Sequence, residues 1–324
     1  MTLILSGFLL GFIGSWLMMR FGEHLGIMDV PCGRSSHVKS VPKGAGFGIL
    51  AALLLSGLML EIPWFVWLPA AVISLASFWG ADKHILPVSR RLLIHFACAL
   101  LFLVFFLASK QADLVTYVAW LPALVFIAGT ANFFNFMDGI DGIAGITGVL
   151  AFLLMAFYAR LTGLSPAGAD LSLVMAFSCL GFLCFNIPKA RVFLGDVGSI
   201  LLGFLFACLV IFLSENITDF LVMTGFLFLF YMDELFTMVV RIRHKDSLIT
   251  PHRKHIYQVL ANEAGMGHFK VALGYGLVQM IIGLSGIAVH PKGWGMLLSI
   301  YLAYGLMFVL FSIIIRNKFV KDEN

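Results

Sequence analysis

Long apolar runs alternate with short polar connections along the whole chain. Most runs are close to the roughly 20 residues that an α-helix needs to cross the hydrocarbon core of a bilayer, and they carry almost no charge. The runs at 44–61 and 64–80 are separated only by Glu61, Ile62 and Pro63, which indicates a tight re-entry. We predict eleven spans, at about residues 2–19, 44–61, 64–80, 92–108, 115–131, 143–160, 171–186, 199–213, 220–240, 270–289 and 295–315.

The composition agrees with this pattern. Hydrophobic residues make up 61% of the chain and charged residues 12%, whereas a soluble domain is about 45–50% apolar and about 25% charged. This excludes a soluble globule, a disordered chain and a nucleic-acid-binding module. The first run lacks a basic start and a cleavage site, so we take it as a span and not a signal peptide. We therefore predict an all-α polytopic integral membrane protein with a single domain over residues 1–324.

Lysine and arginine are unequally divided between the two sets of connections. Of the 21 Lys and Arg residues, only Lys110, Arg160 and Lys292 fall in one set, and the other 18 fall in the opposite set. Because basic connections stay in the cytoplasm, we predict an outer N-terminus and a cytoplasmic C-terminus. The cytoplasmic connections that carry chemistry lie at about 20–43, 81–91, 132–142, 187–199 and 241–269.

One connection carries two amides and two carboxylates at three-residue intervals: Asn132, Asn135, Asp138 and Asp141. On a helix or a 3₁₀ turn this spacing places them on one face at the end of a span. Two acids at a membrane boundary are costly unless positive charge compensates them. The alternative is a solvated helix end, but the adjacent glycines allow a ligand to approach the backbone closely. The pattern therefore favours a divalent cation.

A second acid, Asp196, lies between Gly195 and Gly198 at the mouth of the next span. Mg²⁺ binds through one or two carboxylates, water and substrate phosphates, so this residue suits a metal ligand. A turn followed by a helix N-cap is the alternative for this motif alone. The acidic cluster on the same membrane face favours the metal.

The longest connection carries a run of basic and imidazole side chains, His252, Arg253, Lys254 and His255. Thr250 suits an N-cap and Pro251 a first helical position, so we predict an interfacial helix from there to Gly265. Both histidines would lie in its first turn, where a phosphate could bind. A basic helix that binds anionic lipid is the alternative, and zinc is disfavoured because a third ligand at a known spacing is missing.

Two other connections add charged groups. The first holds Arg34, His37, Lys39 and Lys43, either as phosphate contacts or as a plain basic flank. The second holds Asp82, which follows Ala81. Near the end of the ninth predicted span, Asp233 and Glu234 suggest an interhelical hydrogen bond and a helix-end charge.

Acids for a metal and cationic groups for phosphates thus gather on one membrane face. This asymmetry favours an enzyme that acts on a cytoplasmic nucleotide or phosphate and on a lipid. It disfavours a transporter or flippase, which needs polar residues at mid-membrane and symmetric halves.

Together these motifs resemble the polyprenyl-phosphate N-acetylhexosamine-1-phosphate transferases, glycosyltransferase family 4. The resemblance runs collinearly from about Asp29 to Gln258. Its most specific motifs are Asn132-x-x-Asn135-x-x-Asp138-Gly-x-Asp141-Gly and Phe185-Asn186 followed by Phe193-x-Gly195-Asp196-x-Gly-Ser199. Two further motifs are similar to those of the family branch that serves bacterial O-antigen synthesis: Arg34-Ser-Ser-His37 and His252-Arg-x-His255-x-Tyr257-Gln258. The peptidoglycan branch has three consecutive histidines in the last loop, which this sequence lacks.

The resemblance implies transfer of N-acetylhexosamine 1-phosphate from a UDP-sugar to undecaprenyl phosphate, with release of UMP and with Mg²⁺ or Mn²⁺ as cofactor. Asp196 would be the chief metal ligand, joined by Asp138 and Asp141. His252 and His255 would bind the pyrophosphate. The remaining phosphate and nucleotide contacts would come from Arg34, His37, Lys39, Lys43, Asn132, Asn135, Asn186 and Arg253.

One position departs from the family pattern, which has two adjacent acids where this chain has Ala81 and Asp82. Asp82 would act alone as a catalytic base, or the chain is a non-catalytic member, or Ala81 is an engineered substitution. A lipid phosphate is largely ionised near neutral pH, so a base is dispensable and direct attack on the β-phosphorus is favoured. The expected partners are undecaprenyl phosphate, a UDP-N-acetylhexosamine and membrane lipid, without nucleic acid. A homodimer and the identity of the sugar stay open.

Overall fold

The computed structural model describes the chain except for residues 32–35, 37–38, 83–85, 248–251 and 321–324, and it gives only the backbone of residues 81 and 82. In the described part, the two strands are β1 (Met28–Asp29) and β2 (Val41–Pro42), which pair antiparallel. The α-helices are α1 (Thr2–Phe21), α2 (Gly46–Met59), α3 (Trp64–Ser77), α4 (Val88–Ser109), α5 (Leu114–Ala119), α6 (Leu121–Phe136), α7 (Ile143–Thr162), α8 (Pro166–Asn186), α9 (Asp196–Leu213), α10 (Ile217–Thr224), α11 (Phe228–Arg243), α12 (Ile256–Gln258), α13 (His268–Val289) and α14 (Trp294–Phe319). Short 3₁₀ turns are η2 (Gly225–Leu227) and η4 (His290–Lys292), and π-helical turns are η1 (Phe78–Asp82) and η3 (Val259–Glu263).

The helices coincide with the predicted apolar runs. Nine segments of the described chain are long and apolar enough to cross a membrane, and α2 and α3 are shorter apolar helices of 14 residues each. Helices dominate because a backbone surrounded by lipid must satisfy its hydrogen bonds internally. The predicted class, an all-α polytopic membrane protein, is confirmed. The number of segments that cross the bilayer and their orientation stay predictions.

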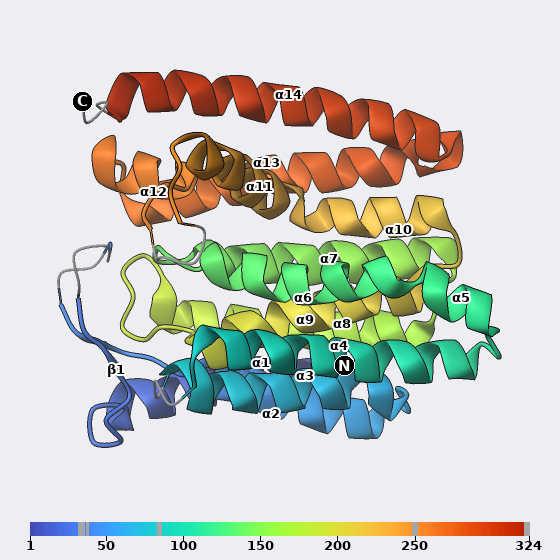
Figure 1. Cartoon of the computed structure of the whole chain (residues 1–324). Coiled ribbons are helices and arrows are strands. Elements are labelled where there is room, and N and C mark those ends of the chain that lie inside the picture. The colour runs from blue at the N-terminus through green and yellow to red at the C-terminus, as the bar shows by residue number, and fades with distance from the viewer. Residues whose placement is uncertain (32–35, 37–38, 83–85, 248–251, 321–324) are drawn as a thin grey trace.

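The helices lie side by side, and the polar connections gather at one end of them. Figure 1 shows β1, α12 and the C-terminus at the same end, whereas α5 lies at the other. Lys110, Arg160 and Lys292 all lie toward the α5 end, because they fall where α4, α7 and α13 finish. The division of charges predicted from the sequence therefore corresponds to two ends of the helical bundle.

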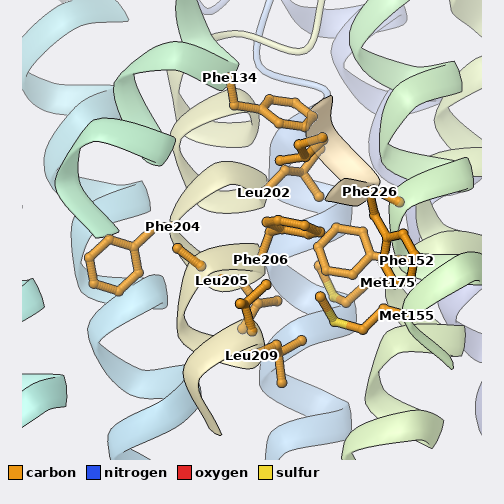
Figure 2. Packing of buried hydrophobic residues seen from close by; sticks show 14 of the residues in the cluster. Phe134, Phe152, Met155, Met175, Leu202, Phe204, Leu205, Phe206, Leu209 and Phe226 are labelled. Atoms are coloured by element: carbon orange, nitrogen blue, oxygen red, sulfur yellow. The ribbon is translucent and has the colours of Figure 1, made fainter. Parts of the chain in front are cut away.

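Helix α9 forms the centre of the bundle. It packs against α2, α3 and α6, and 16 of its 18 residues are buried. Figure 2 shows Phe204 and Phe206 of α9 in the core, with Phe134 of α6 and Phe152 of α7. A helix that is apolar on all sides is stable only when it is surrounded by other elements. Because α9 begins at Asp196, this packing holds one candidate carboxylate at the polar end of the bundle.

Glycines allow α1 to pack backbone to backbone against α8. A side chain on Gly11 would collide with the carbonyl of Ser178, and one on Gly181 would collide with the carbonyl of Phe8. Such close approach through small residues is common between membrane helices. Helix α1 therefore packs directly against α8, which comes from the middle of the sequence.

Candidate active site

Asp196 is held at the start of a buried helix. The preceding residue, Gly195, has a φ of 74°, a conformation that favours glycine. The Asp196 side chain is 29% exposed, and its Oδ2 lies 3.4 Å from Nη1 of Arg91 in α4. A carboxylate is also stabilised by the dipole at a helix N-terminus. The site thus contains an accessible carboxylate beside a guanidinium, and Arg91 was not among the predicted site residues.

The loop before Asp196 is hydrogen-bonded to the first polar connection. The N–H of Phe193 donates to the carbonyl of Pro42 at 2.8 Å, and the N–H of Gly44 donates to the carbonyl of Phe193 at 3.1 Å. Lys43 and Phe193 form a parallel bridge between these segments. Lys43 and Asp196, which are far apart in sequence, are consequently carried by segments that are bonded to each other.

The two amides at the end of α6 point toward different helices. Asn132 Nδ2 lies 3.0 Å from Nδ1 of His95 in α4, whereas Asn135 Nδ2 donates to Ser199 Oγ of α9 at 2.8 Å. The helix ends before Asp138. The predicted common face for all four polar residues is therefore wrong. Asn135 contacts the first turn of the helix that carries the candidate metal ligand, and Asn132 does not.

The two acids of this connection lie in the turn after α6. Asp141 Oδ2 is 3.3 Å from Nδ1 of His268, the first residue of α13. Asp138 is partly buried near Tyr257, whose hydroxyl lies against Gly139. Burial, and then the negative charge of nearby carboxylates that include Asp138, raises the pKa of Tyr257 well above its usual value. The acidic turn is thus enclosed by the last polar connection and by α13.

Asn186 joins two of the candidate loops. It is the last residue of α8 and is only 5% exposed. Its Oδ1 accepts the N–H of Gly142 at 2.7 Å, and its Nδ2 donates to the carbonyl of Val192 at 3.0 Å. Both the oxygen and the nitrogen of the side-chain amide are hydrogen-bonded within the protein, so the structure gives Asn186 a role in holding the loops together.

A cavity of about 150 Å³ opens between these loops. Side chains from different connections, those of Lys39, Lys189 and His268, meet there with Asp141 and the ring of Phe193. Its other lining residues are Ser36, Val41 and Ala190. A larger hollow of about 800 Å³ lies at the α5 end and contains none of the predicted site residues. The small cavity is therefore the candidate substrate site.

The last polar connection differs from its predicted form. Residues 252–254 are not helical, α12 begins at Ile256, and His255 is its N-cap. The predicted start at Pro251 is wrong, and Thr250 and Pro251 themselves lie outside the described residues. The reason is a buried acid: Asp233 of α11 accepts the N–H of Ile256 at 2.9 Å, and so caps the helix from a distance in sequence.

The two histidines of this connection lie in different surroundings. The His255 side chain is 3% exposed, with Nε2 3.3 Å from Glu234 Oε2 and Nδ1 3.7 Å from Asp233 Oδ1. His252 is half-buried, and its ring centroid lies 4.8 Å from that of His255. Burial, and then the charges of His255, Arg241 and Lys254, lowers the pKa of His252 to about 4. His252 is therefore uncharged at neutral pH in this structure.

The basic residues beside the histidines have acidic partners. Arg253 Nη2 lies 3.1 Å from Glu263 Oε1, and Lys254 Nζ lies 2.6 Å from Asp246 Oδ2. The hydrogen bond from Lys254 holds the pKa of Asp246 below its usual value. These ion pairs fold the connection back on itself, and the Arg253 guanidinium keeps N–H donors besides the one that pairs with Glu263.

The first and last polar connections also meet. Asn262 Nδ2 donates to Ser36 Oγ at 3.2 Å. Arg34 and His37, on either side of that serine, lie outside the described residues, as does the side chain of Asp82. The contact nevertheless shows that the segment predicted to bind phosphates lies beside the histidine connection.

The geometry can be set against known proteins. The model of glycosyl transferase family 4 matches residues 63–214, which include both the acidic turn and Asp196. A relative from Bacillus subtilis, named a probable undecaprenyl-phosphate N-acetylglucosaminyl 1-phosphate transferase, is 28% identical over 94% of this chain and 87% of its own length. The chain is thus similar to the polyprenyl-phosphate N-acetylhexosamine-1-phosphate transferases of glycosyl transferase family 4.

Other transferases match shorter stretches of the chain. An undecaprenyl-phosphate alpha-N-acetylglucosaminyl 1-phosphate transferase from Thermotoga maritima is 33% identical over 34% of this chain and 38% of its own. A phospho-N-acetylmuramoyl-pentapeptide-transferase from Staphylococcus epidermidis is 33% identical over 39% of each chain. These relatives are phosphotransferases, and on this likeness the protein is an enzyme of the same kind.

A divalent metal in this candidate site would need the substrate as a further ligand. Among the residues that the structure describes, no group of three or more carboxylate, imidazole or thiol side chains could hold a metal by itself. Asp196 nevertheless offers a partly exposed carboxylate, and Mg²⁺ commonly takes one or two carboxylates plus water and substrate phosphates. The donor set fits a metal shared with a phosphate substrate and does not fit a closed protein cage.

Sequence reasoning missed three residues of the candidate site: Arg91, Lys189 and His268. Each lies in or beside a connection of the basic set, which was the available signal. Their partners, however, come from other parts of the chain. Arg91 pairs with Asp196 and His268 with Asp141, and Lys189 lines the same cavity as Asp141.

Proposed function

We propose that the protein transfers N-acetylhexosamine 1-phosphate from a UDP-sugar to undecaprenyl phosphate and releases UMP. The observation that carries this proposal is the cavity that brings Lys39, Lys189 and Phe193 together with Asp141. The names of the Bacillus subtilis and Thermotoga maritima relatives support undecaprenyl phosphate as the acceptor. The site would face the cytoplasm of a bacterial inner membrane, where nucleotide sugars are available.

The residues of the cavity suit the donor. Lys39 and Lys189 attract the diphosphate as point charges. The Phe193 ring offers a face on which a nucleobase can stack. His268 orients Asp141, because its Nδ1 lies 3.3 Å from that carboxylate. The first connection would add Arg34, His37 and Lys43 as further phosphate contacts.

We assign Mg²⁺ or Mn²⁺ chiefly to Asp196, with Asp138 and Asp141 as further ligands. When bound, the cation supplies positive charge where negative charge develops on the transferred phosphoryl group. Arg91 lies 3.4 Å from Asp196 and compensates this carboxylate before the cation arrives.

The chemical step is one displacement at the β-phosphorus. An oxygen of the lipid phosphate forms the new P–O bond while the bond from the β-phosphorus to the α–β bridging oxygen breaks, and UMP leaves with that oxygen. The attacking phosphate is already ionised near neutral pH, so Asp82 without a second acid at Ala81 is sufficient. The pKa of His252, which is about 4 in this structure, should rise beside the diphosphate, since a nearby anion favours the charged imidazolium.

The motifs around Arg34 and His252 favour a role in starting O-antigen or another surface glycan. The product, a sugar linked to a polyprenyl diphosphate, would be the first lipid-linked unit of that glycan.

The test is UMP release by the purified protein with a panel of UDP-N-acetylhexosamines and undecaprenyl phosphate. We expect release only when donor, lipid and a divalent cation are all present. The Bacillus subtilis relative serves as the positive control in the same detergent. If no donor in the panel gives UMP while that control is active, the proposal is wrong. Donor binding without turnover would instead indicate a non-catalytic member of the family.

A further inference from the structure

A line of buried polar side chains connects the last helix to the histidine segment. Arg316 of α14 donates through Nη2 to Thr237 Oγ1 at 3.1 Å, and this hydroxyl donates to Asp233 Oδ1 at 3.2 Å. Asp233 then accepts the N–H groups of Ile256 and Tyr257 at 2.9 and 3.3 Å. The line thus runs from α14 through α11 to the first residues of α12.

Asp233, the carboxylate at the centre of this line, is costly to bury. Asp233 is 0% exposed, and an ionised carboxylate removed from water is strongly destabilising unless it is paired or hydrogen-bonded. The structure supplies these bonds from three directions, because the hydroxyl of Tyr275 in α13 also donates to Oδ2 at 2.7 Å. A well-packed apolar residue would often be as stable here, so stability alone does not explain an acid at this position.

A further role is visible in what Asp233 holds. It satisfies two backbone N–H groups directly after His255, and its Oδ1 is also 3.7 Å from Nδ1 of the imidazole. Without the carboxylate, the buried N–H groups of Ile256 and Tyr257 would lack these partners, and an unsatisfied buried donor destabilises the position it occupies. The segment would then leave its position.

Helix α14 therefore reaches the site without entering it. None of its residues lines the candidate cavity or belongs to the predicted site, yet Arg316 is bonded to Thr237. We infer that Arg316, Thr237 and Asp233 form a positioning relay that fixes the segment His252–Gln258 for transfer. This inference rests on the proposed function, since it assigns a further set of positioning residues to the same site.

Kinetics of single and double variants test the relay. Arg316→Met and Thr237→Val should each lower kcat roughly tenfold, the equivalent of about 1.4 kcal/mol. The KM for the UDP-sugar should stay nearly unchanged, because a displaced histidine segment harms the transition state more than donor binding. The double variant should be no slower than either single variant, since both remove the same interaction. Arg316→Lys should restore part of the rate.

The matched control is Tyr304→Phe. It also removes a hydrogen bond of α14, from Tyr304 to Ser285 of α13 at 3.2 Å, but that bond lies outside the relay. We expect its kcat to equal that of the wild type. An equal loss of rate in Tyr304→Phe, or additive losses in the double variant, would show that α14 acts only through general stability and would overturn the inference.

Hydrogen exchange gives a readout that does not depend on activity. In the substrate-free protein, the amides of Ile256 and Tyr257 should exchange faster in Thr237→Val and Arg316→Met than in the wild type or in Tyr304→Phe. Unchanged exchange in both relay variants would overturn the relay, whatever their rates. If exchange accelerates but the wild type releases no UMP, the proposed function fails while the anchoring of the segment stands. Asp233→Asn belongs to the same series, and Thr237→Val replaces it if that variant does not fold.

Discussion

Replacing His252 with glutamine should make the protein less sensitive to acid. In the folded protein, burial and then neighbouring positive charges lower the pKa of His252 to about 4, whereas an unfolded histidine titrates near 6.5. Between these values the unfolded chain binds more protons than the folded chain. The free energy of unfolding therefore falls as the pH drops from about 6.5 toward 4.

The size of the effect follows from the two pKa values. Between about pH 7 and about pH 5, this one group should remove about 2 kcal/mol from the free energy of unfolding. Since the ring is only half-buried, solvent screening reduces the expected value to about 1 kcal/mol. Glutamine does not titrate, and its side-chain oxygen can accept the N–H of Lys254, which lies 3.4 Å from His252 Nδ1. The glutamine variant should therefore not show this fall in the free energy of unfolding as the pH drops.

The assay is thermal unfolding in detergent at about pH 7.5 and about pH 5, where about 1 kcal/mol corresponds to roughly 2–4 °C for a domain of this size class. The wild-type midpoint should fall further between the two pH values than that of His252→Gln. The exposed His24 provides the control, because His24→Gln should follow the wild type. Parallel pH dependence in the wild type and His252→Gln would refute the reasoning, since the ring would then titrate equally in both states.

Three further predictions concern the transfer reaction. Asp196→Asn should remove most UMP release, as should a chelator, whereas Asp170→Asn at the opposite end should remain active; full activity of the Asp196→Asn variant would exclude the metal assignment. Ala81→Asp should not lower the rate of UMP release, and a clear loss would show that the alanine is functional. His255→Ala should lower kcat roughly 10- to 150-fold, because it removes the charge-assisted interaction that the imidazole would make with the diphosphate. Excess Mg²⁺ should leave that loss unchanged, and a rescue to full rate would move His255 to the metal site.

The sequence was most informative where a single segment determines its own structure. The apolar runs predicted the helical segments, because a lipid-facing backbone has few alternatives to a helix. The predicted span at 199–213 likewise lies within α9, which begins three residues earlier, directly after Gly195 with its φ of 74°. These features depend on neighbours in sequence.

Features that depend on distant partners could not be predicted in the same way. The start of α12 is set by Asp233, and the sequence shows only a threonine and a proline at a plausible earlier start. The separation of Asn132 from Asn135 follows from which helices surround α6. His268 became a candidate only because α13 begins beside the acidic turn, where the ring meets Asp141.

The glycine contact between α1 and α8 has a consequence for the order of assembly during synthesis. Gly11 lies against Ser178, a residue 167 positions later in the chain. At about 5–20 residues per second, the partner helix is made roughly 8–33 s after the first helix. During that interval α8 is absent from the glycine face of α1, whereas Gly48 of α2, which also packs against this face, is made much sooner. A bulky residue at position 11 would therefore leave the insertion of α1 intact, and the failure would occur later, when α8 arrives and cannot dock.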